Sequence, residues 1–238
     1  MSFIVVIPAR YNSGRFPGKP LIKIKGVPMI IRTFNQCLKA VNRKKIFVAT
    51  DDQRIEELCK KNKINAIMTS KKCLTGTDRI AEVSKKIKVD SYINVQGDEP
   101  IFNPRDIKKL IYFAKKNRHL IINGYCKIKN EKLFRSGNIP KVVFRNDGRL
   151  LYMSRAAIPT TKKLKYKIAW RQVCAYSLPY KALQSFSRQQ RKTQLENLED
   201  CELLRFLELG YEIKMIRMSD RSISVDVKKD LKRIKQYI

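Results

Sequence analysis

Ile4-Val5-Val6-Ile7-Pro8-Ala9-Arg10-Tyr11-Asn12-Ser13-Gly14-Arg15-Phe16-Pro17-Gly18-Lys19-Pro20-Leu21 opens the chain as an apolar run that passes into a loop with three cations. Residues 4–7 are typical of a strand that is buried on both faces. Open α/β folds bind ligands in the loops that follow the carboxyl ends of such strands. The cations Arg10, Arg15 and Lys19 therefore indicate either a phosphate site or a surface loop with solvated side chains.

The first half of the chain repeats a strand-helix pattern at short intervals. Strands are expected at 45–50, 66–68 and 91–96. Helices are expected at 29–40, from the N-cap pair Asp51-Asp52 to residue 61, around Ile80, Val83 and Ile87, and after the N-cap pair Asn103-Pro104. This alternation favours a mostly parallel sheet that is covered by helices on both faces.

The second half of the chain has a different pattern. Residues 141–145 and 150–153 flank Asn146-Asp147-Gly148, which is a hairpin signal. The remaining expected elements are a polar loop at 160–167, a strand at 169–177, a helix at 198–209 ended by Gly210, a strand at 212–217 and a last helix with Val227, Leu231, Ile234 and Ile238 on one face. Because there is no repeat or linker-like break, we predict a single domain, residues 1–238, with an inserted antiparallel arm at about 123–180.

The overall composition narrows the class of protein. The 238 residues are 43% hydrophobic, which is enough for one large core or two small ones. No apolar run approaches the roughly 20 residues that span a bilayer. Met1-Ser2-Phe3 leads directly into a strand, without the pattern of a secretory signal. We therefore expect a cytoplasmic protein without membrane insertion.

Cysteine and histidine content limits the metal chemistry. The six cysteines form no Cys-x-x-Cys pair, and the single histidine, His119, follows a basic run at an expected helix end. Free thiols in a reducing compartment and a solvated histidine fit this distribution best. A metal site built here consists of carboxylates and water, which favours magnesium.

The formal net charge of +31 indicates an anionic partner, which is a nucleic acid, a membrane surface or a phosphorylated small molecule. The lysines are spread along the chain, mostly as doublets on expected helix faces. They form neither a tail nor an arginine-rich block. The charge alone does not choose among these partners.

The opening loop fits neither of two common phosphate-binding motifs. A P-loop requires Gly-x-x-x-x-Gly-Lys-Ser/Thr, whereas Gly14 and Gly18 are one residue too close together and Pro20 follows Lys19. The dinucleotide pattern Gly-x-Gly-x-x-Gly is also absent. Phosphate would therefore be held by side-chain cations and backbone amides, with a metal ion held from elsewhere.

Two aspartates at expected strand ends are the candidate metal ligands. Asp98 follows a strand in Gln96-Gly97-Asp98, at the same sheet edge as the opening loop. Asp226 ends the segment Ser222-Ile223-Ser224-Val225-Asp226 ahead of the last helix. Each aspartate has an alternative role as a turn or helix-capping residue. As a pair they would hold Mg²⁺ on a triphosphate.

A series of motifs spans nearly the whole chain. They are Val5-Val6-Ile7-Pro8-Ala9-Arg10-Tyr11, Pro17-Gly18-Lys19-Pro20-Leu21, Val48-Ala49-Thr50-Asp51, Gly76-Thr77-Asp78-Arg79-Ile80-Ala81-Glu82, Asn94-Val95-Gln96-Gly97-Asp98-Glu99-Pro100, Ser154-Arg155-Ala156-x-Ile158-Pro159, Leu195-Glu196-x-x-Glu199-x-x-Glu202-x-x-Arg205 and Val225-Asp226-x-x-x-Asp230-Leu231. In order and spacing the series resembles the 3-deoxy-manno-octulosonate cytidylyltransferases, the CMP-Kdo synthetases. Several motifs at corresponding intervals make this resemblance more specific than any one motif.

This resemblance implies an α/β, Rossmann-like fold of the nucleotide-diphospho-sugar transferase type. Its mostly parallel mixed sheet would be flanked by helices, and the arm at about 123–180 would carry the dimer contact and part of the sugar site. The implied activity joins CTP to Kdo, an acidic eight-carbon 3-deoxy sugar, and gives CMP-Kdo and pyrophosphate for lipopolysaccharide or capsule synthesis. The implied cofactor is Mg²⁺, and the implied assembly is a homodimer.

The resemblance also implies roles for matched residues. Arg10 and Lys19, with Arg15 as a third cation, would neutralise the triphosphate, while Asp98 and Asp226 would hold the metal. The expected CTP contacts are Pro8, Ala9, Arg10, Arg15, Lys19, Thr75, Gly76, Thr77, Arg79 and Gln96. The expected contacts to the sugar acid are Gln96, Arg155, Gln172, Tyr176, Glu196 and Glu199, with the Arg155 guanidinium suited to a carboxylate.

The sugar half of the expected site departs from the family pattern. The family segment His-Leu-Gly-x-Tyr-Gly-Tyr is replaced by Gln172-Val173-Cys174-Ala175-Tyr176-Ser177-Leu178, and residues 123–134 also differ. A cytidylyltransferase for a modified or nine-carbon acid, such as amino-Kdo or a sialic-like acid, is therefore an alternative, and an inactive homologue is another. A basic nucleic-acid-binding protein is disfavoured, because it does not explain two strand-end carboxylates beside a cationic loop.

Overall fold

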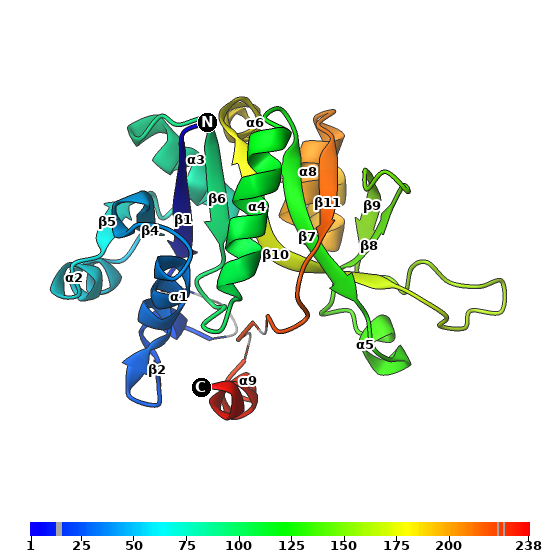
Figure 1. Cartoon of the computed structure of the whole chain (residues 1–238), viewed down its shortest axis with the longest axis horizontal. Helices are drawn as coiled ribbons and strands as arrows, with labels where there is room; N and C mark the ends of the chain where they lie inside the picture. Colours follow the sequence, from blue (N-terminus) through cyan, green and yellow to red (C-terminus); the bar gives the residue numbers. More distant parts are fainter. Residues whose placement is uncertain (13–15, 223, 226) are drawn as a thin grey trace.

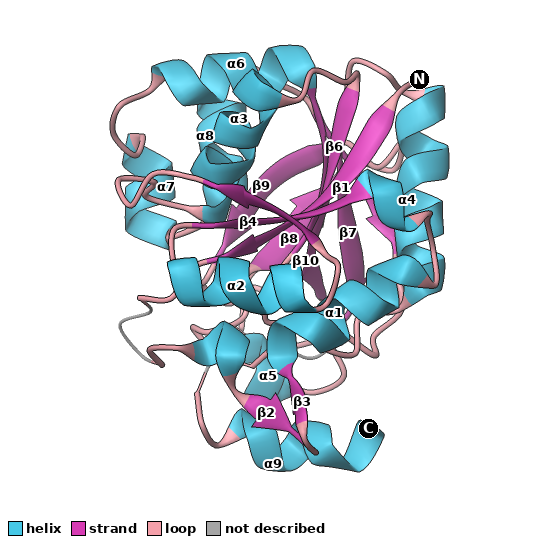
Figure 2. Ribbon diagram, turned by 90° about the vertical axis from the view of Figure 1, so that its left-hand side faces the viewer, coloured by secondary structure: helices cyan, strands magenta, loops and turns pink. Residues whose placement is uncertain are grey.

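A mixed sheet runs through the centre of the molecule, with helices on both of its faces (Figures 1 and 2). The computed structural model describes residues 1–12, 16–222, 224–225 and 227–238. The strand order along the main path is β11-β7-β10-β6-β1-β4-β5. The bounds are β1 Phe3–Ala9, β4 Ile46–Thr50, β5 Asn65–Met68, β6 Ser91–Val95, β7 Ile121–Lys127, β10 Trp170–Pro179 and β11 Ile213–Arg217.

The directions of the strands indicate at which edge of the sheet a ligand would bind. β1 is parallel to β4 and β6, β4 is parallel to β5, and β7 is parallel to β11. Only β10 runs antiparallel, to both β6 and β7, among the described strands of this path. The carboxyl ends of β1, β4 and β6 therefore meet at one edge, and the predicted mostly parallel α/β fold is confirmed.

Helices follow the strands, and the first four of them do so in the order that the sequence pattern predicts. Their bounds are α1 Met29–Leu38, α2 Gln53–Lys61, α3 Gly76–Lys86, α4 Pro104–Lys116, α5 Glu131–Arg135, α6 Tyr180–Arg188, α7 Gln194–Glu199, α8 Glu202–Glu208 and α9 Asp230–Ile234. The side chains of Asp52 and Asn103 accept hydrogen bonds at the first turns of α2 and α4. These two N-caps satisfy backbone amides that have no partner within the helix.

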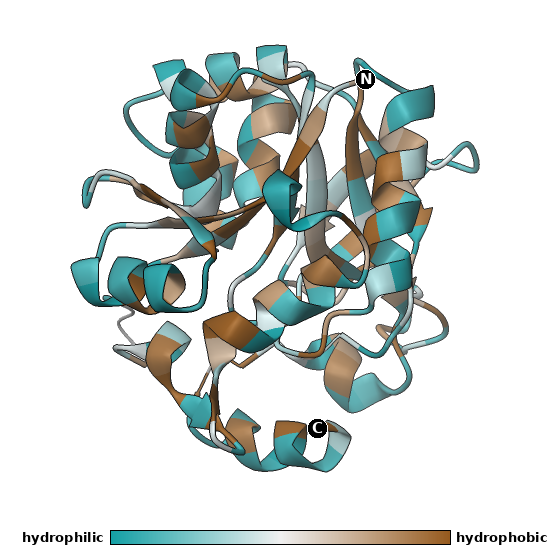
Figure 3. Cartoon of the chain, turned by 60° about the vertical axis from the view of Figure 1, so that its left-hand side comes forward, coloured by the Kyte–Doolittle hydropathy of each residue, from teal (hydrophilic) through white to brown (hydrophobic). Residues whose placement is uncertain are grey.

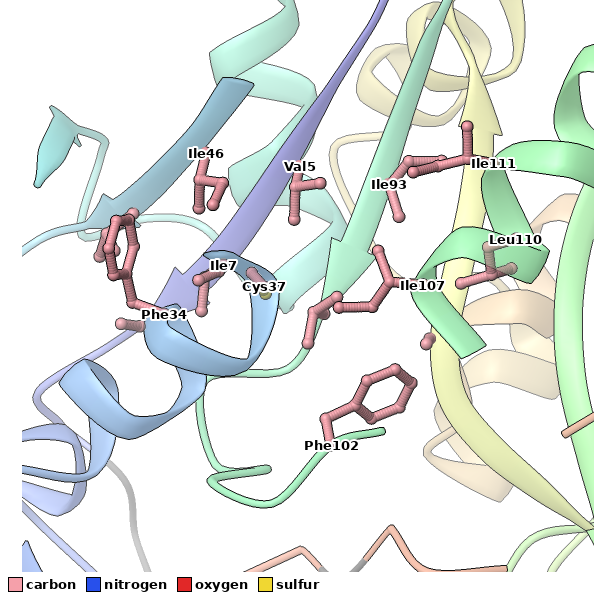
Figure 4. Close-up of a cluster of buried hydrophobic side chains, with 14 of the residues drawn as sticks. Val5, Ile7, Phe34, Cys37, Ile46, Ile93, Phe102, Ile107, Leu110 and Ile111 are labelled. Carbon is pink, nitrogen blue, oxygen red and sulfur yellow. The ribbon is translucent and has the colours of Figure 1, made fainter. Parts of the chain in front are cut away.

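Alternate residues of β1 enter two different hydrophobic cores. Val5 and Ile7 belong to the core that contains Phe34 of α1 and Leu110 of α4 (Figure 4). Val6 belongs to the core on the opposite face, formed with α3, α6 and α8. Because strand side chains alternate between faces, a continuous apolar run fills both cores. Hydrophilic residues are concentrated on the outward turns of the helices (Figure 3).

The segment between β7 and β10 projects from the main sheet (Figure 1). It contains α5 and a hairpin of β8, Lys141–Phe144, and β9, Leu150–Ser154. Gly148 has a φ of 83°, which only glycine adopts readily, so the predicted turn at Asn146-Asp147-Gly148 is confirmed. β8 also pairs with the start of β10, which joins the projecting arm to the main sheet.

The helix predicted at 198–209 is wrong as one continuous element. α7 ends at Glu199, Asp200 adopts a left-handed conformation with φ 47° and ψ 48°, and α8 begins at Glu202. The Arg155 guanidinium donates to the backbone oxygens of Glu199 and Asp200, at 2.5 and 3.0 Å. A contact from a residue more than forty positions away in sequence therefore stabilises this break.

Several elements were absent from the sequence prediction, among them β7, α5 and α6. The interior glycine of β7, Gly124, obscures the strand pattern, yet a Cβ there would lie 2.1 Å from Sδ of Met218. The last helix is also shorter than predicted, because α9 covers Asp230–Ile234 and passes into a 3-10 turn. Val227 is 39% exposed and does not share the buried position of Ile234.

The C-terminal helix packs near the short strands β2, Lys23–Ile24, and β3, Val27–Pro28 (Figure 2). Ile24, Met29, Val225 and Ile234 form one buried cluster there. In the part of the chain that the structure describes, no helix combines the length and apolarity needed to cross a membrane.

Candidate active site

A cavity of about 310 Å³ lies at the carboxyl ends of β1 and β6. The opening loop contributes Pro8, Ala9, Arg10, Lys19 and Pro20, and the loop after β6 contributes Gln96, Gly97 and Asp98. The start of α3 and the chain around α7 and α8 contribute Leu74, Thr75, Gly76, Arg79, Lys192, Asp200 and Glu202. The structure therefore brings the predicted cationic loop and the predicted Gln-Gly-Asp loop together.

A cation and a carboxylate from the two loops meet at this cavity. Nζ of Lys19 lies 2.5 Å from Oδ2 of Asp98, and the two side chains are 14% and 25% exposed. Gly18, with a φ of 69°, turns the chain so that Lys19 begins a 3-10 turn. The pair is accessible from the cavity, which suits a bound phosphate and its counter-ion.

Gly97 allows the second loop to lie directly against the end of β1. A Cβ at this position would be only 2.7 Å from the backbone oxygen of Pro8. The hydroxyl of Thr33 in α1 also donates to the Gly97 oxygen, at 3.1 Å. This close approach determines where Gln96 and Asp98 enter the cavity.

The α3 N-terminus forms another wall of the cavity. Thr75 caps the helix in a reciprocal arrangement with Asp78. The backbone amides of Gly76 and Thr77 donate to the Glu202 carboxylate, each at 3.0 Å. Burial raises the pKa of Glu202, against the opposing effect of these hydrogen bonds. A carboxylate thus occupies the helix N-terminus beside Gly76.

Arg79 lies in the cavity wall and is held there by two polar contacts. Its guanidinium donates to Oδ2 of Asp51 at 2.9 Å and to the Thr69 hydroxyl, and the residue is 2% exposed. These contacts join α3 to the segments that follow β4 and β5. Arg79 therefore holds the wall that carries Thr75 and Gly76.

A row of polar side chains leads from the cavity to β10. Gln96 lies near the Tyr176 hydroxyl, and Nε2 of Gln172 donates to the same hydroxyl at 3.4 Å. Tyr176 and Gln172 are 4% and 7% exposed. Burial holds the pKa of Tyr176 well above its usual value, so the hydroxyl remains protonated at neutral pH. The predicted residues Gln96, Tyr176 and Gln172 are thus adjacent.

Among the described residues that line the cavity, Gln96 is the one predicted sugar contact, and Arg155, Glu196 and Glu199 are engaged in contacts around it. Glu196 is fully buried and pairs with Arg205, with Nε–Oε2 and Nη2–Oε1 distances of 2.5 and 2.8 Å. Glu199 accepts from the Ser154 hydroxyl at 2.5 Å and from the Arg155 amide at 2.7 Å. The Arg155 guanidinium contacts backbone oxygens at the break between α7 and α8.

The cavity also contains residues without a predicted role. Lys192 and Asp200 form an ion pair, with an Nζ–Oδ1 distance of 2.7 Å, and Glu202 lies beside Gly76. The Lys192 contact, despite partial burial, and the more distant charges of Arg155 and Arg10 lower the pKa of Asp200. The spacing of three residues between Glu196, Glu199 and Glu202 was the sequence signal that could have identified Glu202 as a site residue. The expected continuous helix gave no reason to separate Glu202 from the other two.

Arg15 and Asp226 lie outside the described residues, so the structure gives no position for either. Among the described residues there is no group of three or more His, Cys, Asp or Glu side chains arranged for a metal ion. Nucleotide-bound Mg²⁺ requires only one or two protein carboxylates, together with water and phosphate oxygens. Asp98, at the cavity beside Lys19, fits the part of a protein ligand to such an ion.

The central sheet and its strand-end cavity define a nucleotidyltransferase of the Rossmann-like α/β class. Residues 4–218 match the model of the cytidylyltransferase family, and the chain belongs to this family. Within it, the chain is a member of the 3-deoxy-manno-octulosonate cytidylyltransferases, the CMP-Kdo synthetases. The resemblance inferred from the motif series is therefore confirmed.

Two curated relatives illustrate the similarity. The 3-deoxy-manno-octulosonate cytidylyltransferase of Syntrophus aciditrophicus is 36% identical over 242 residues, which cover 99% of this chain and 96% of that protein. The 8-amino-3,8-dideoxy-manno-octulosonate cytidylyltransferase of Shewanella oneidensis is 34% identical over 244 residues, covering 100% of this chain and 99% of the relative. The chain is thus similar to proteins named for two different sugars.

Solved structures show the same relationship. A CMP:2-keto-3-deoxy-manno-octonic acid synthetase complexed with CTP superposes with a TM-score of 0.92 at 32% identity, covering 100% of this chain and 98% of that one. A cytidylyltransferase from Leptospira borgpetersenii has a TM-score of 0.66 at 13% identity and covers 100% and 88% of the two chains. The second likeness concerns the fold alone.

Proposed function

We propose that this chain activates Kdo, or a closely related 3-deoxy ulosonic acid, with CTP to give the CMP-sugar and pyrophosphate. The Lys19–Asp98 pair at the strand-end cavity is the observation that carries this proposal. It supplies a cation for phosphate and a carboxylate for a metal ion at one place. The proposed product serves lipopolysaccharide or capsule synthesis, and the proposed location is the cytoplasm.

The cations of the opening loop act on the triphosphate. Arg10 and Lys19 line the same cavity and stabilise negative charge that develops as pyrophosphate leaves. Arg15 is a third cation of this loop in the sequence. The anomeric hydroxyl of the sugar attacks the α-phosphorus, and the bond from this phosphorus to the pyrophosphate oxygen breaks. No covalent enzyme intermediate is required.

Asp98 and Asp226 are the proposed protein ligands of Mg²⁺. When bound, the ion would neutralise phosphate charge and help to orient the α-phosphate for in-line attack. Asp98 is held toward the cavity by the turn at Gly97 and by its contact with Lys19. A metal ion held by Asp98 would lie beside Lys19, which supports the proposed orientation of the triphosphate.

The nucleotide is held mainly by backbone and short side chains. Pro8, Ala9, Thr75 and Gly76 line the cavity, and Arg79 stabilises that wall. Short residues leave room for the cytosine and ribose.

The acceptor is proposed to bind along the row of Gln96, Tyr176 and Gln172. These side chains provide amide and hydroxyl partners for sugar hydroxyls, and Arg155, Glu196 and Glu199 hold the segment around α7 and α8. Gln172 occupies the position of a histidine in the family pattern, so it is the residue most suited to alter the accepted sugar. An amino-Kdo or a nine-carbon acid remains the alternative substrate of the same class.

A substrate panel tests the proposed activity. Purified protein, CTP and Mg²⁺ are mixed with Kdo, with 8-amino-3,8-dideoxy-manno-octulosonate or with N-acetylneuraminic acid, and pyrophosphate release is followed. We expect the fastest release with an eight-carbon 3-deoxy acid. Faster release with the nine-carbon acid would select the alternative, and no release with any acid would contradict the proposed function.

We further propose a homodimer that forms through the projecting arm. Exposed apolar side chains gather there, with Leu151, Leu164 and Ile168 exposed by 60%, 65% and 42%. The rings of Tyr125, Phe144 and Trp170 lie side by side near the base of the arm. Apolar surface of this kind marks an interface.

Light scattering after size-exclusion chromatography tests the dimer. We expect twice the chain mass for the wild type and the monomer mass for Leu151→Glu. Leu198→Glu is the matched control, because Leu198 is 72% exposed on α7, outside the arm. A monomeric wild type would contradict the proposal.

A further inference from the structure

A fully buried lysine lies where the arm joins the main body. Lys141 is the first residue of β8 and is 0% exposed. Its Nζ donates to the backbone oxygen of Ser136 at 2.9 Å and to the backbone oxygen of Arg155 at 2.5 Å. A lysine is seldom buried without a specific set of partners, because its charge loses hydration.

The contact from Lys141 holds one side of the Arg155 backbone. The other side is held by Glu199, whose Oε2 accepts from the Arg155 amide at 2.7 Å. Because the Arg155 backbone is held from both sides, the Arg155 side chain points toward the break between α7 and α8. There Nε and Nη2 contact the oxygens of Glu199 and Asp200.

This break carries two residues of the cavity wall, Asp200 and Glu202, and a third, Lys192, is held to it by an ion pair. Asp200 has a left-handed conformation and pairs with Lys192, and Glu202 follows at the start of α8. Lys192, Asp200 and Glu202 all line the cavity, whereas Lys141 does not. The Lys141 side chain is therefore connected to the cavity through the Arg155 backbone and the α7–α8 break.

The opposite wall does not depend on this chain of contacts. Lys19 and Asp98 are positioned by the loops after β1 and β6, where Gly97 packs against Pro8. A change at Lys141 would thus act on one wall and leave the phosphate-binding wall in place. Because the two walls are held separately, a role of Lys141 can be recognised by comparing sugar binding with CTP binding.

We propose that Lys141 is a positioning residue for the acceptor sugar, acting through Arg155 to hold the α7–α8 wall of the cavity. The inference rests on the proposed cytidylyltransferase function. Burial and the neighbouring Arg155 charge lower the pKa of Lys141, while the Glu199 carboxylate opposes this change. A neutral amine still has two N–H donors, so the two backbone oxygens can be satisfied in either protonation state.

Kinetics of the variant Lys141→Met test the proposal. At saturating CTP and Mg²⁺, the sugar KM is measured by pyrophosphate release, and CTP affinity is measured separately by calorimetry. We expect the sugar KM to rise by about tenfold or more while the CTP Kd changes by less than about twofold. Lys141→Arg, which keeps the cation and its donors, is expected to recover part of the loss.

Lys132→Met is the matched control, because Lys132 is exposed on α5, in the same projecting segment. Trp170, the single tryptophan, pairs with Val142 beside Lys141, so its emission reports whether the arm is folded. An unchanged sugar KM in folded Lys141→Met, or equal changes in sugar KM and CTP Kd, would overturn the proposal. A wild type that releases no pyrophosphate would instead count against the proposed function.

If Lys141→Met does not fold, the proposal is tested by amide hydrogen exchange of the wild-type protein in place of variant kinetics. Sugar addition is expected to slow amide exchange at 136–141 and 199–202 together, although residues 136–141 do not line the cavity. Protection at 199–202 without any change at 136–141 would overturn the proposal.

Discussion

Nζ of Lys19 lies 2.5 Å from Oδ2 of Asp98, although the two residues are separated by 79 positions in sequence. The parallel pairing of β1 with β6 creates this proximity, since it brings the ends of both strands to one edge of the sheet. In the proposed function, Lys19 is the cation for the phosphates and Asp98 is the carboxylate for a metal ion. The first predictions concern this pair and the glycine beside it.

Replacing Lys19 with methionine should remove a charge that acts on the departing pyrophosphate. We expect kcat/KM to fall by about 10²–10³-fold, the effect typical of losing one electrostatic donor. Steady-state pyrophosphate release measures the change. Lys23→Met is the control, because Lys23 is an exposed residue of the short strand β2. Wild-type kcat/KM in Lys19→Met would exclude a role for Lys19 in catalysis.

Substituting alanine for Gly97 should displace the loop that carries Gln96 and Asp98. A Cβ would lie 2.7 Å from the Pro8 oxygen, a backbone atom that cannot move aside as a flexible side chain would. We expect a loss of about 1–3 kcal/mol of unfolding free energy, as for an overpacked site, with a clear fall in kcat. Gly137→Ala is the control, since a Cβ there has no atom within 4 Å. Equal stability of the two variants would refute the close-approach argument.

The Arg205 ion pairs should contribute to stability more than to catalysis. Arg205 is fully buried, contacts Glu196 and Asp78, and lies over the Phe186 ring. Arg205→Met leaves two carboxylates without their cation, so we expect a loss of about 3–5 kcal/mol. Urea unfolding measures this loss.

A double variant checks the same explanation. Removing both charges with Arg205→Met and Glu196→Leu should restore part of the lost unfolding free energy, because a buried pair costs less to replace than to break. Arg188→Met, at an exposed position on α6, should have little effect. A double variant much less stable than Arg205→Met alone would contradict this account.

Glu199 should make stability sensitive to acid. Burial opposes its ionisation, but hydrogen bonds from the Ser154 hydroxyl and the Arg155 amide dominate and lower its pKa below 4.5. Because the folded-state pKa is lower than the unfolded-state pKa, the charged group stabilises the fold above about pH 4.5. This contribution is lost as the pH falls through the folded-state pKa.

Unfolding free energies from pH 7 to pH 3 test this dependence. The difference between wild type and Glu199→Gln should be largest near neutral pH and should shrink on acidification. Glu57→Gln, at an exposed position of α2, should give a difference that varies little with pH. A wild-type advantage over Glu199→Gln that grew on acidification would show that the sign is wrong.

Much of the nucleotide side was predictable from local sequence. The apolar run before Arg10 predicts a buried strand, and the apolar run before Gln96 predicts another. Strands of an α/β sheet end at a common edge, so the loops carrying Lys19 and Asp98 were expected to meet there. The structure confirms this placement, while Arg15 and Asp226 lie outside its described residues.

The three glutamates near α7 required the tertiary structure. Glu196, Glu199 and Glu202 recur at the same spacing, so periodicity treats them as equivalent. In the fold, Glu196 pairs with Arg205, Glu199 holds Arg155, and Glu202 reaches the cavity. Sequence spacing does not reveal the break at Asp200, because the donors that stabilise it come from Arg155.

The sequence by itself determined the parallel strands of the first half of the chain and the cationic loop at their carboxyl ends, because these follow from local apolar patterns and from the common direction of parallel strands. Only the tertiary structure decided which polar residues face the cavity and which support it. The physical reason is that a side chain such as Arg155 takes its partners from segments that meet only after folding.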